Sequence, residues 1–403
     1  MPSVTDFLKK TIITPIKNPP QSKFGLTIAI SGNGKVIAIS STENSEERSL
    51  VGVVYVFIND NDKWIQKSVL KSSITNYYDS FGISLAINED GSTLVIGACH
   101  HGSTILRKRG AVFIYERKED EWILDEKIIE NSIGRDSYFG WSIAINAAGD
   151  RLVVSDIAIS GTIFIYKKIN KWTLDTILKN SVKEMKLFHN DWYGYSTGIN
   201  STGNIIVVAS LFTKKDNDSR VGSIDIYKEI NDKWRLIGNL IPNECNVDSH
   251  YGWSLDINDD VSIIIVSSIN SNYKGKMHVG TVYIYRLKDF EWILEDKLYP
   301  SNPNSYDNFG YCVRIARKRE RIIASTHNNK LNKSFVNVYD NDGSGWEKKA
   351  MLIPDTGNER FAIDASINDD GRIISIGSFI FSIEDQIEKG ITYIYIDKRE
   401  KNE

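Results

Sequence analysis

The chain has 403 residues, more than one hydrophobic core usually supports, so several domains or a repeat architecture are expected. Hydrophobic residues make up 41%, charged residues 25%, and the formal net charge is −3, so no nucleic-acid partner is expected. No apolar run of about 18 residues and no signal-peptide core is present, which predicts no membrane insertion and an intracellular or virion-associated location. Three scattered cysteines favour neither a disulfide framework nor a zinc site.

The first expected element is a β-strand at residues 7–15, FLKKTIITP, which has no obvious partner nearby. A repeat begins after it. Seven similar segments, such as FGISLAINEDGSTLVIG, start with an aromatic residue at intervals of 52 to 58 residues. A period of this length indicates a stacked or circular repeat fold. The segments start at Phe24, Phe81, Phe139, Tyr193, Tyr251, Phe309 and Phe361.

Each unit contains four expected strands and no helical periodicity. The first two form a hairpin with a tight turn, and an apolar third strand follows a variable stretch. In the first strand Phe81, Ile83 and Leu85 alternate with small residues, so large faces can pack on small faces of the next unit. This predicts an all-β, seven-bladed β-propeller of four-stranded antiparallel blades spanning residues 1–403. Six units add a fourth strand led by Trp64, Trp122, Trp172, Trp234, Trp292 and Trp346.

The seventh unit lacks its own tryptophan-led strand. Residues 7–15 have the aromatic-to-proline spacing of the fourth strands 234–242 and 346–354. We therefore predict that residues 7–15 complete blade seven and close the ring, which leaves no exposed terminal blade edge.

Six units start with Phe-Gly or Tyr-Gly, the seventh starts with Phe361-Ala362, and Gly97-Ala98 adds a further partial match. From Phe24 to Ile396 these units resemble the FG-GAP repeats of integrin α-subunit propellers. The resemblance implies a propeller fold, and such folds serve many functions. The DxDxDG calcium loop of several integrin-type blades has no counterpart here, because the corresponding turns read NEDG, NDDV and NDDG. We expect no calcium or other cofactor.

In a propeller, the loops from strand four to strand one and from strand two to strand three share one face, called here the top face. All six histidines fall in or beside these loops. One interpretation is that these histidines are ordinary polar loop residues. The alternative is that they form a site for a ligand, a metal or a pH response, although the spacing between them in the sequence does not match a metal-binding motif. Between strands two and three lie His100, His101, His278 and His327, whereas His189 and His250 precede strand one.

Aromatic residues stand two positions after the leading aromatic in blades three to six. Their place in the alternation predicts packing between blades, and the alternative is a binding hot spot or a sugar-stacking platform. They are Trp141, Tyr195, Trp253 and Tyr311, with Trp192 nearby. Acidic residues also recur two or three positions before the leading aromatic. We interpret them as local turn acceptors, with an anionic ring at the channel mouth as the alternative.

Two basic runs and one charge pair stand out. Arg107, Lys108 and Arg109 fall on a top-face loop, and residues 317–321, RKRER, replace the first turn of blade six on the opposite face. We expect both runs to be solvated loop tips, and the alternative is that they contact an acidic surface. Asp256 and Arg314 occupy equivalent inner positions where other blades have small residues, which predicts a direct structural salt bridge. The alternative is that both extend separately into a wet channel and bind something there.

No nucleophile elbow, phosphate-binding loop or catalytic carboxylate pair is recognisable. The sequence therefore predicts a non-catalytic protein-interaction or scaffold module that binds unknown protein partners through its top-face loops. The composition also fits a viral or protist structural or attachment component. The alternative function is a carbohydrate-binding or glycan-processing propeller.

Overall fold

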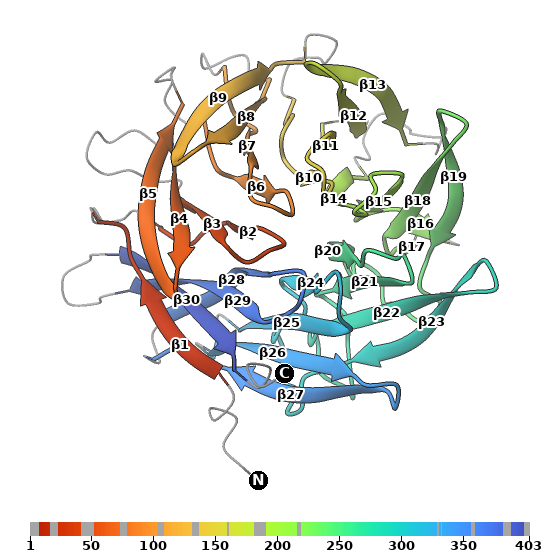
Figure 1. The fold of residues 1–403 in the computed structure, drawn as a ribbon. Coiled ribbons are helices and arrows are strands. Elements are labelled where there is room, and N and C mark those ends of the chain that lie inside the picture. The colour runs from red at the N-terminus through yellow and green to blue at the C-terminus, as the bar shows by residue number, and fades with distance from the viewer. Residues whose placement is uncertain are drawn as a thin grey trace.

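A computed structural model shows an all-β ring with the sheets arranged around a central axis (Figure 1). It describes residues 8–16, 23–41, 52–72, 79–102, 109–130, 137–158, 161–180, 191–215, 219–328, 330–331, 333–355, 359–381 and 388–398. Within these residues there are seven four-stranded antiparallel sheets, so the predicted seven-bladed β-propeller is confirmed. No helix in these ranges is long and apolar enough to cross a membrane.

Each blade runs from an inner strand at the axis to an outer strand at the circumference. The inner strands of blades one to seven are β2 (Ile28–Ile30), β6 (Ser84–Ile87), β10 (Ile143–Ile145), β14 (Tyr193–Ile199), β20 (Tyr251–Ile257), β24 (Val313–Ile315) and β28 (Glu359–Ile367). The second strands are β3 (Val36–Ser41), β7 (Thr93–Ala98), β11 (Arg151–Asp156), β15 (Ile205–Ser210), β21 (Ile263–Ser268), β25 (Arg321–Asn328) and β29 (Ile373–Phe381).

The third strands are β4 (Val53–Asp60), β8 (Ala111–Lys118), β12 (Thr162–Lys168), β18 (Ser223–Ile230), β22 (Thr281–Lys288), β26 (Lys333–Asn341) and β30 (Glu388–Asp397). The outer strands are β5 (Lys63–Lys71), β9 (Glu121–Ile128), β13 (Trp172–Lys179), β19 (Lys233–Leu240), β23 (Glu291–Leu298), β27 (Trp346–Leu352) and, for blade seven, β1 (Leu8–Ile13). A small separate sheet joins β16 (Lys214–Lys215) and β17 (Ser219–Arg220).

The N-terminal strand closes the ring as predicted. β1 pairs antiparallel with β30, from Leu8 opposite Asp397 to Ile13 opposite Thr392. The red N-terminal strand therefore lies beside the blue C-terminal strands in Figure 1. Ile13 is buried in a hydrophobic core that also contains Ile394 and Ile396. The two ends of the chain thus share one sheet and one core.

A bulge interrupts the inner strand directly after its leading aromatic. In β20, Tyr251 pairs with Ser268 but Leu255 pairs with Val266, so the inner strand contains two extra residues. Gly252 lies between them with φ of 97°, a conformation that glycine adopts readily. Tyr251 and Leu255 share one core, which does not include Trp253. The predicted uninterrupted alternation is therefore wrong here, because the bulge takes the second residue after the aromatic out of the core.

The third residue after the leading aromatic links one blade to the next around the channel. In blades one, two and five this residue is a serine or threonine whose hydroxyl donates to a backbone carbonyl of the following blade. Cys312 of blade six donates to the carbonyl of Ala365, and Asp364 of blade seven accepts from the backbone N–H of Ile28 at 2.9 Å. The hydroxyl links are Thr27 to Ile83, Ser84 to Gly140 and Ser254 to Val313.

Glycines before several third strands lie against the leading aromatic of the next blade. Gly280 has φ of 86°, and a Cβ at this position would lie 2.2 Å from the carbonyl oxygen of Phe309. Gly52, Gly110 and Gly222 make the same approach, at 2.1 to 2.2 Å. The close contact between blades therefore requires glycine at these positions.

The basic run at residues 317–321 does not consist of solvated tips. The side chain of Arg321 is only 1% exposed, and it binds the carboxylates of Asp340 at 2.6 Å and Asp397 at 2.9 Å. Arg317 lies within 4 Å of Asp259 and Asp369, the acids of the neighbouring turns. Lys318 pairs with Glu89 of blade two. Acidic side chains of this chain therefore neutralise the run.

Candidate functional site

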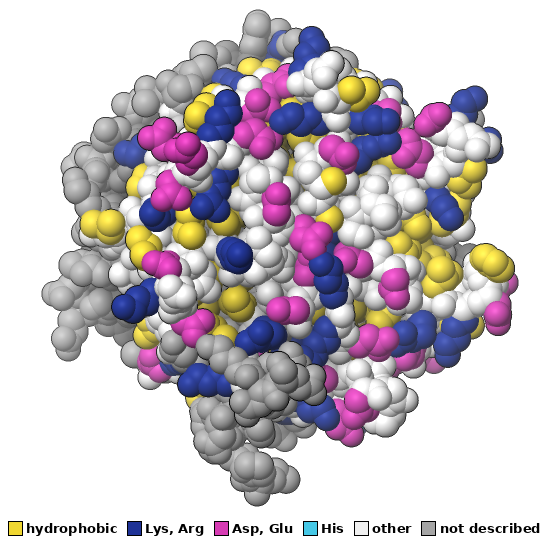
Figure 2. Space-filling view, viewed as in Figure 1, with side chains coloured by type: hydrophobic (Ala, Val, Ile, Leu, Met, Phe, Trp, Pro, Cys, Tyr) yellow, Lys and Arg dark blue, Asp and Glu magenta, His cyan; other side chains and the backbone are white. Residues whose placement is uncertain are grey.

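The inner strands enclose a central channel of about 420 Å³, lined by residues of all seven blades. The ion pair between Lys318 and Glu89 joins blades two and six, which are not neighbours, and so crosses the bottom end. Backbone hydrogen bonds also connect adjacent bottom turns, for example Asn33 to Glu89 and Asp369 to Gly32. Figure 2 shows acidic and basic side chains together at the centre of one face, on which no histidine is visible. The more accessible mouth is therefore on the top face.

Four aromatic side chains form an arc around this mouth, and we call them the inner arc. Ring centroids of neighbours lie 5.7 Å apart for Trp141 and Tyr195, 5.1 Å for Tyr195 and Trp253, and 5.4 Å for Trp253 and Tyr311. All four line the channel and are half-buried. None of the four belongs to a hydrophobic core, but neighbouring rings come from successive blades and contact each other. They therefore pack between blades at the channel mouth rather than in the blade cores.

A second tier of rings lies outside the inner arc. Trp192 stacks on Tyr195 at 5.7 Å and an interplanar angle of 11°, and His250 stacks on Trp253 at 6.0 Å and 9°. Phe212 contacts Trp192 and His250 edge-on, at 5.2 and 5.3 Å. Tyr138 meets the inner arc at its blade-three end. We call the inner arc with Tyr138, Trp192, Phe212 and His250 the aromatic platform.

The repeat positions the outer tier in a regular way. Trp192 and His250 directly precede the leading aromatic and have φ of 50° and 55°. Phe212 follows the leading aromatic of blade four by nineteen residues, as Asn270 does in blade five. The residue before the leading aromatic contacts the residue nineteen positions after it in the same blade. Trp192 contacts Phe212 in this way, and His250 contacts Asn270. The loops of successive blades therefore form one continuous rim.

The predicted histidines fall into two groups. His327 extends the inner arc beyond Tyr311, at 5.3 Å, and its Nδ1 lies 3.2 Å from the hydroxyl of Ser334. At the other end His100 contacts Tyr138, and its Nδ1 lies 2.8 Å from the hydroxyl of Ser80. These two histidines thus flank the platform.

His101 and His278 lie apart from the inner arc. His101 is buried, and its Nδ1 lies 2.8 Å from the carboxylate of Asp79. His278 stacks on Tyr306 at 5.3 Å. Asp307 is also buried and accepts from Asn328. Asp79 therefore binds a side chain of its own blade, whereas Asp307 also accepts from the backbone N–H of Asn304 at 2.7 Å, the local turn contact that the sequence predicts. Both carboxylates are buried and do not form an anionic ring at the mouth.

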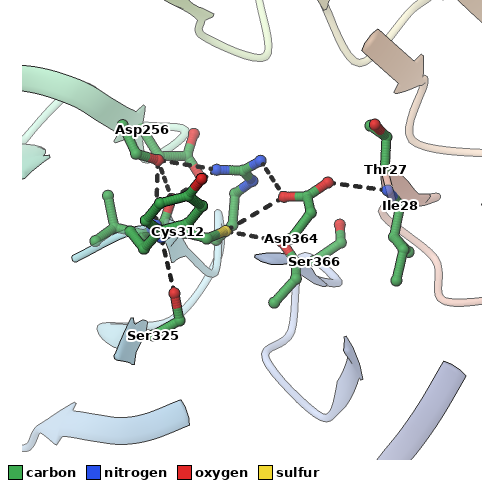
Figure 3. A network of polar contacts seen from close by, with 12 residues as sticks. Thr27, Ile28, Asp256, Cys312, Ser325, Asp364 and Ser366 are labelled. Carbon is green, nitrogen blue, oxygen red and sulfur yellow. Dashed lines mark hydrogen bonds and ion pairs between the residues drawn. The ribbon is translucent and has the colours of Figure 1, made fainter. Parts of the chain in front are cut away.

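The charged inner residues do not form the predicted pair. The guanidinium of Arg314 lies 3.0 Å from the carboxylate of Asp364, whereas no ion pair within 4 Å joins it to Asp256. Asp256 instead accepts from the backbone N–H of Ile315 in the next blade at 3.1 Å. Figure 3 shows Asp364 between Cys312 and Ile28, so this one carboxylate connects blades six, seven and one. Burial raises the pKa of Asp256, although Arg314 and Arg317 oppose the rise.

The other predicted residues give no common site. Arg109 is half-buried, and its backbone N–H bonds to the carbonyl of His101, whereas Arg107, Lys108 and His189 lie outside the described residues. Among the described side chains, no three histidine, cysteine or acidic groups converge in a way that could hold a metal ion.

Sequence reasoning missed Tyr138, Phe212 and Asp364. Aligning the units at the third position after the leading aromatic would have identified Asp364, since the other blades have Thr, Ser or Cys there. Phe212 gave no such signal, because residues of several kinds occupy its repeat position.

No protein-family model and no curated protein matches the sequence.

Proposed function

We propose that this chain is a non-catalytic interaction module that binds a segment of a protein partner at the aromatic platform. The observation that supports the proposal is the continuous set of eight rings at the top mouth. Tryptophan and tyrosine that are only half-buried offer large contact areas at little cost in side-chain entropy, and such residues dominate binding hot spots. The seven-bladed propeller fold is consistent with such a role. The FG-GAP relationship and the location of the protein stay predictions.

Carbohydrate binding is the second candidate. Below the inner arc the channel lining includes serine and threonine residues, such as Ser142, Ser196 and Thr197. Hydroxyls that can donate and accept, together with aromatic faces, suit a sugar as well. Protein binding is favoured because the platform extends beyond the channel mouth to the outer tier, which exceeds what one sugar ring contacts.

A selection experiment distinguishes the two candidates. A random-peptide phage library and a glycan array are each applied to the wild-type protein at pH 7.5. We expect enriched peptides whose binding falls at least tenfold in Tyr195→Ala, because the central ring of the inner arc is lost.

Phe290→Ala is the matched control. Phe290 is fully exposed on the turn between β22 and β23, outside the platform, and its removal is expected to leave peptide binding unchanged. Specific glycan binding that depends on Tyr195, without peptide enrichment, supports the second candidate and contradicts the first. The melting temperature of each variant shows whether it is folded.

A further inference from the structure

His250 is the member of the aromatic platform that can change charge near neutral pH. Its half-buried ring stacks on Trp253 and meets the edge of Phe212. It thus connects the inner arc to the outer tier of blade four. A change in the position of this ring would move both neighbours.

The hydrogen bond of His250 fixes its protonation state. Its Nδ1 lies 3.2 Å from the amide nitrogen of Asn270. The same nitrogen lies 3.2 Å from the carbonyl oxygen of Asp248, and the amide oxygen of Asn270 accepts from Asn308 at 3.4 Å. A flipped amide would place two oxygens together at Asp248, so the nitrogen must donate toward His250. Nδ1 is therefore an unprotonated acceptor.

Protonation would convert this hydrogen bond into a contact between two donors. The amide of Asn270 cannot turn to relieve it without losing its bonds to Asp248 and Asn308. The rings of Trp253 and Phe212 offer no acceptor oxygen on the other sides. A charged imidazole in this position would keep a half-buried positive charge with its Nδ1 proton unbonded, which is costly.

Burial favours the neutral form of His250 at pH 7. Burial lowers the pKa of His250, and nearby His278 lowers it further, whereas Asp248 on the preceding loop raises it. The net direction is downward from the ordinary histidine value. Phe212, Trp253 and Asn270, which come from three other segments, contribute no charge. The imidazole therefore accepts a proton only in mild acid.

We propose that His250 is a pH-responsive positioning residue: the neutral ring holds Trp253 and Phe212 in the platform, and protonation breaks its bond to Asn270 and displaces them. Ligand binding at the platform is consequently lost in mild acid. This consequence rests on the proposed function, whereas the change in the platform itself needs no partner.

The test follows tryptophan fluorescence and the NMR titration of the histidine Cε1–H signals from pH 8 to pH 5. In the wild-type protein we expect a reversible fluorescence transition with the same midpoint as the His250 signal, below that of an ordinary histidine. His250→Gln offers a carboxamide oxygen to Asn270 and does not titrate, so it should abolish the transition. Asn270→Asp supplies an acceptor for the Nδ1 proton and should raise the midpoint by at least one pH unit.

His278→Gln is the matched control, because it removes a neighbouring histidine but leaves the Asn270 bond. It should retain the transition. A transition that persists in His250→Gln overturns the proposal, and so does a His250 titration without a change in fluorescence.

A binding measurement then separates the two proposals. Peptides selected at pH 7.5 should bind the wild-type protein at least tenfold more weakly at pH 5.5, and His250→Gln less than twofold more weakly. If no peptide is selected but the transition depends on His250, the proposed function fails and the platform change stands. If selected peptides bind the wild-type protein equally at both pH values, the pH control of binding is overturned.

Discussion

The guanidinium of Arg321 in blade six lies 2.9 Å from the carboxylate of Asp397 in blade seven, and both side chains are almost fully buried. The same guanidinium makes two hydrogen bonds to Asp340, at 2.6 and 2.7 Å. The guanidinium of Arg321 therefore binds one acid of blade six and one acid of blade seven, at the interface between these two blades.

We expect Arg321→Ala to lower the free energy of unfolding by about 3–5 kcal/mol, because it removes the buried cation that Asp340 and Asp397 share. Urea unfolding followed by circular dichroism measures this. Lys349→Ala, which removes an ion pair to the more exposed Glu347, should lower the free energy of unfolding far less. Equal losses in the two variants would show that the buried cluster contributes little.

Deletion of residues 1–15 should lower the free energy of unfolding by several kcal/mol. The loss includes the ladder from Leu8 to Ile13, at about 1 kcal/mol per hydrogen bond, and the burial of Ile13. Deletion of residues 1–6, which leaves β1 intact, is the control. An unchanged melting temperature after the longer deletion would be incompatible with ring closure by β1.

Gly280→Ala should destabilise the protein by about 2–4 kcal/mol, because its Cβ would lie 2.2 Å from the carbonyl of Phe309. Gly275→Ala is a close control. Gly275 also has positive φ, at 74°, but no atom lies within 4 Å of the added Cβ, so about 1 kcal/mol is expected. Similar thermal shifts in the two variants would mean that backbone conformation alone matters.

The effect of Asp369 on stability should depend on pH. Burial raises the pKa of this carboxyl to about 6, with Asp259 and Glu89 adding to the rise against Arg317. The folded state therefore keeps a proton that the unfolded state releases, and this contribution is lost as pH rises from about 4 to about 6. Relative to the wild type, Asp369→Asn should gain about 3 kcal/mol over that range.

Urea titrations at several pH values measure this difference. Asp370→Asn, at the exposed neighbouring position, should show no comparable gain. A constant difference between Asp369→Asn and the wild type would contradict the raised pKa.

The repeat made the fold predictable, because seven aligned segments average out local ambiguity and the aromatic-to-proline spacing identified residues 7–15 as a missing outer strand. The site was less predictable. Trp253 leaves the core only because Gly252 adopts positive φ, and the resulting bulge is not part of a simple alternation. Likewise, Arg314 reaches Asp364 rather than Asp256, and the repeat position of neither residue indicates that pairing.

The inner arc gives a nearly rotationally symmetric ring a single orientation. Blades one, two and seven have Leu26, Ile83 and Ile363 where blades three to six have aromatic rings. A ligand that needs ring contacts can therefore settle at only one angle about the propeller axis. One repeat position is aromatic in four blades and aliphatic in the other three. This difference would let the module set the direction in which a bound partner extends.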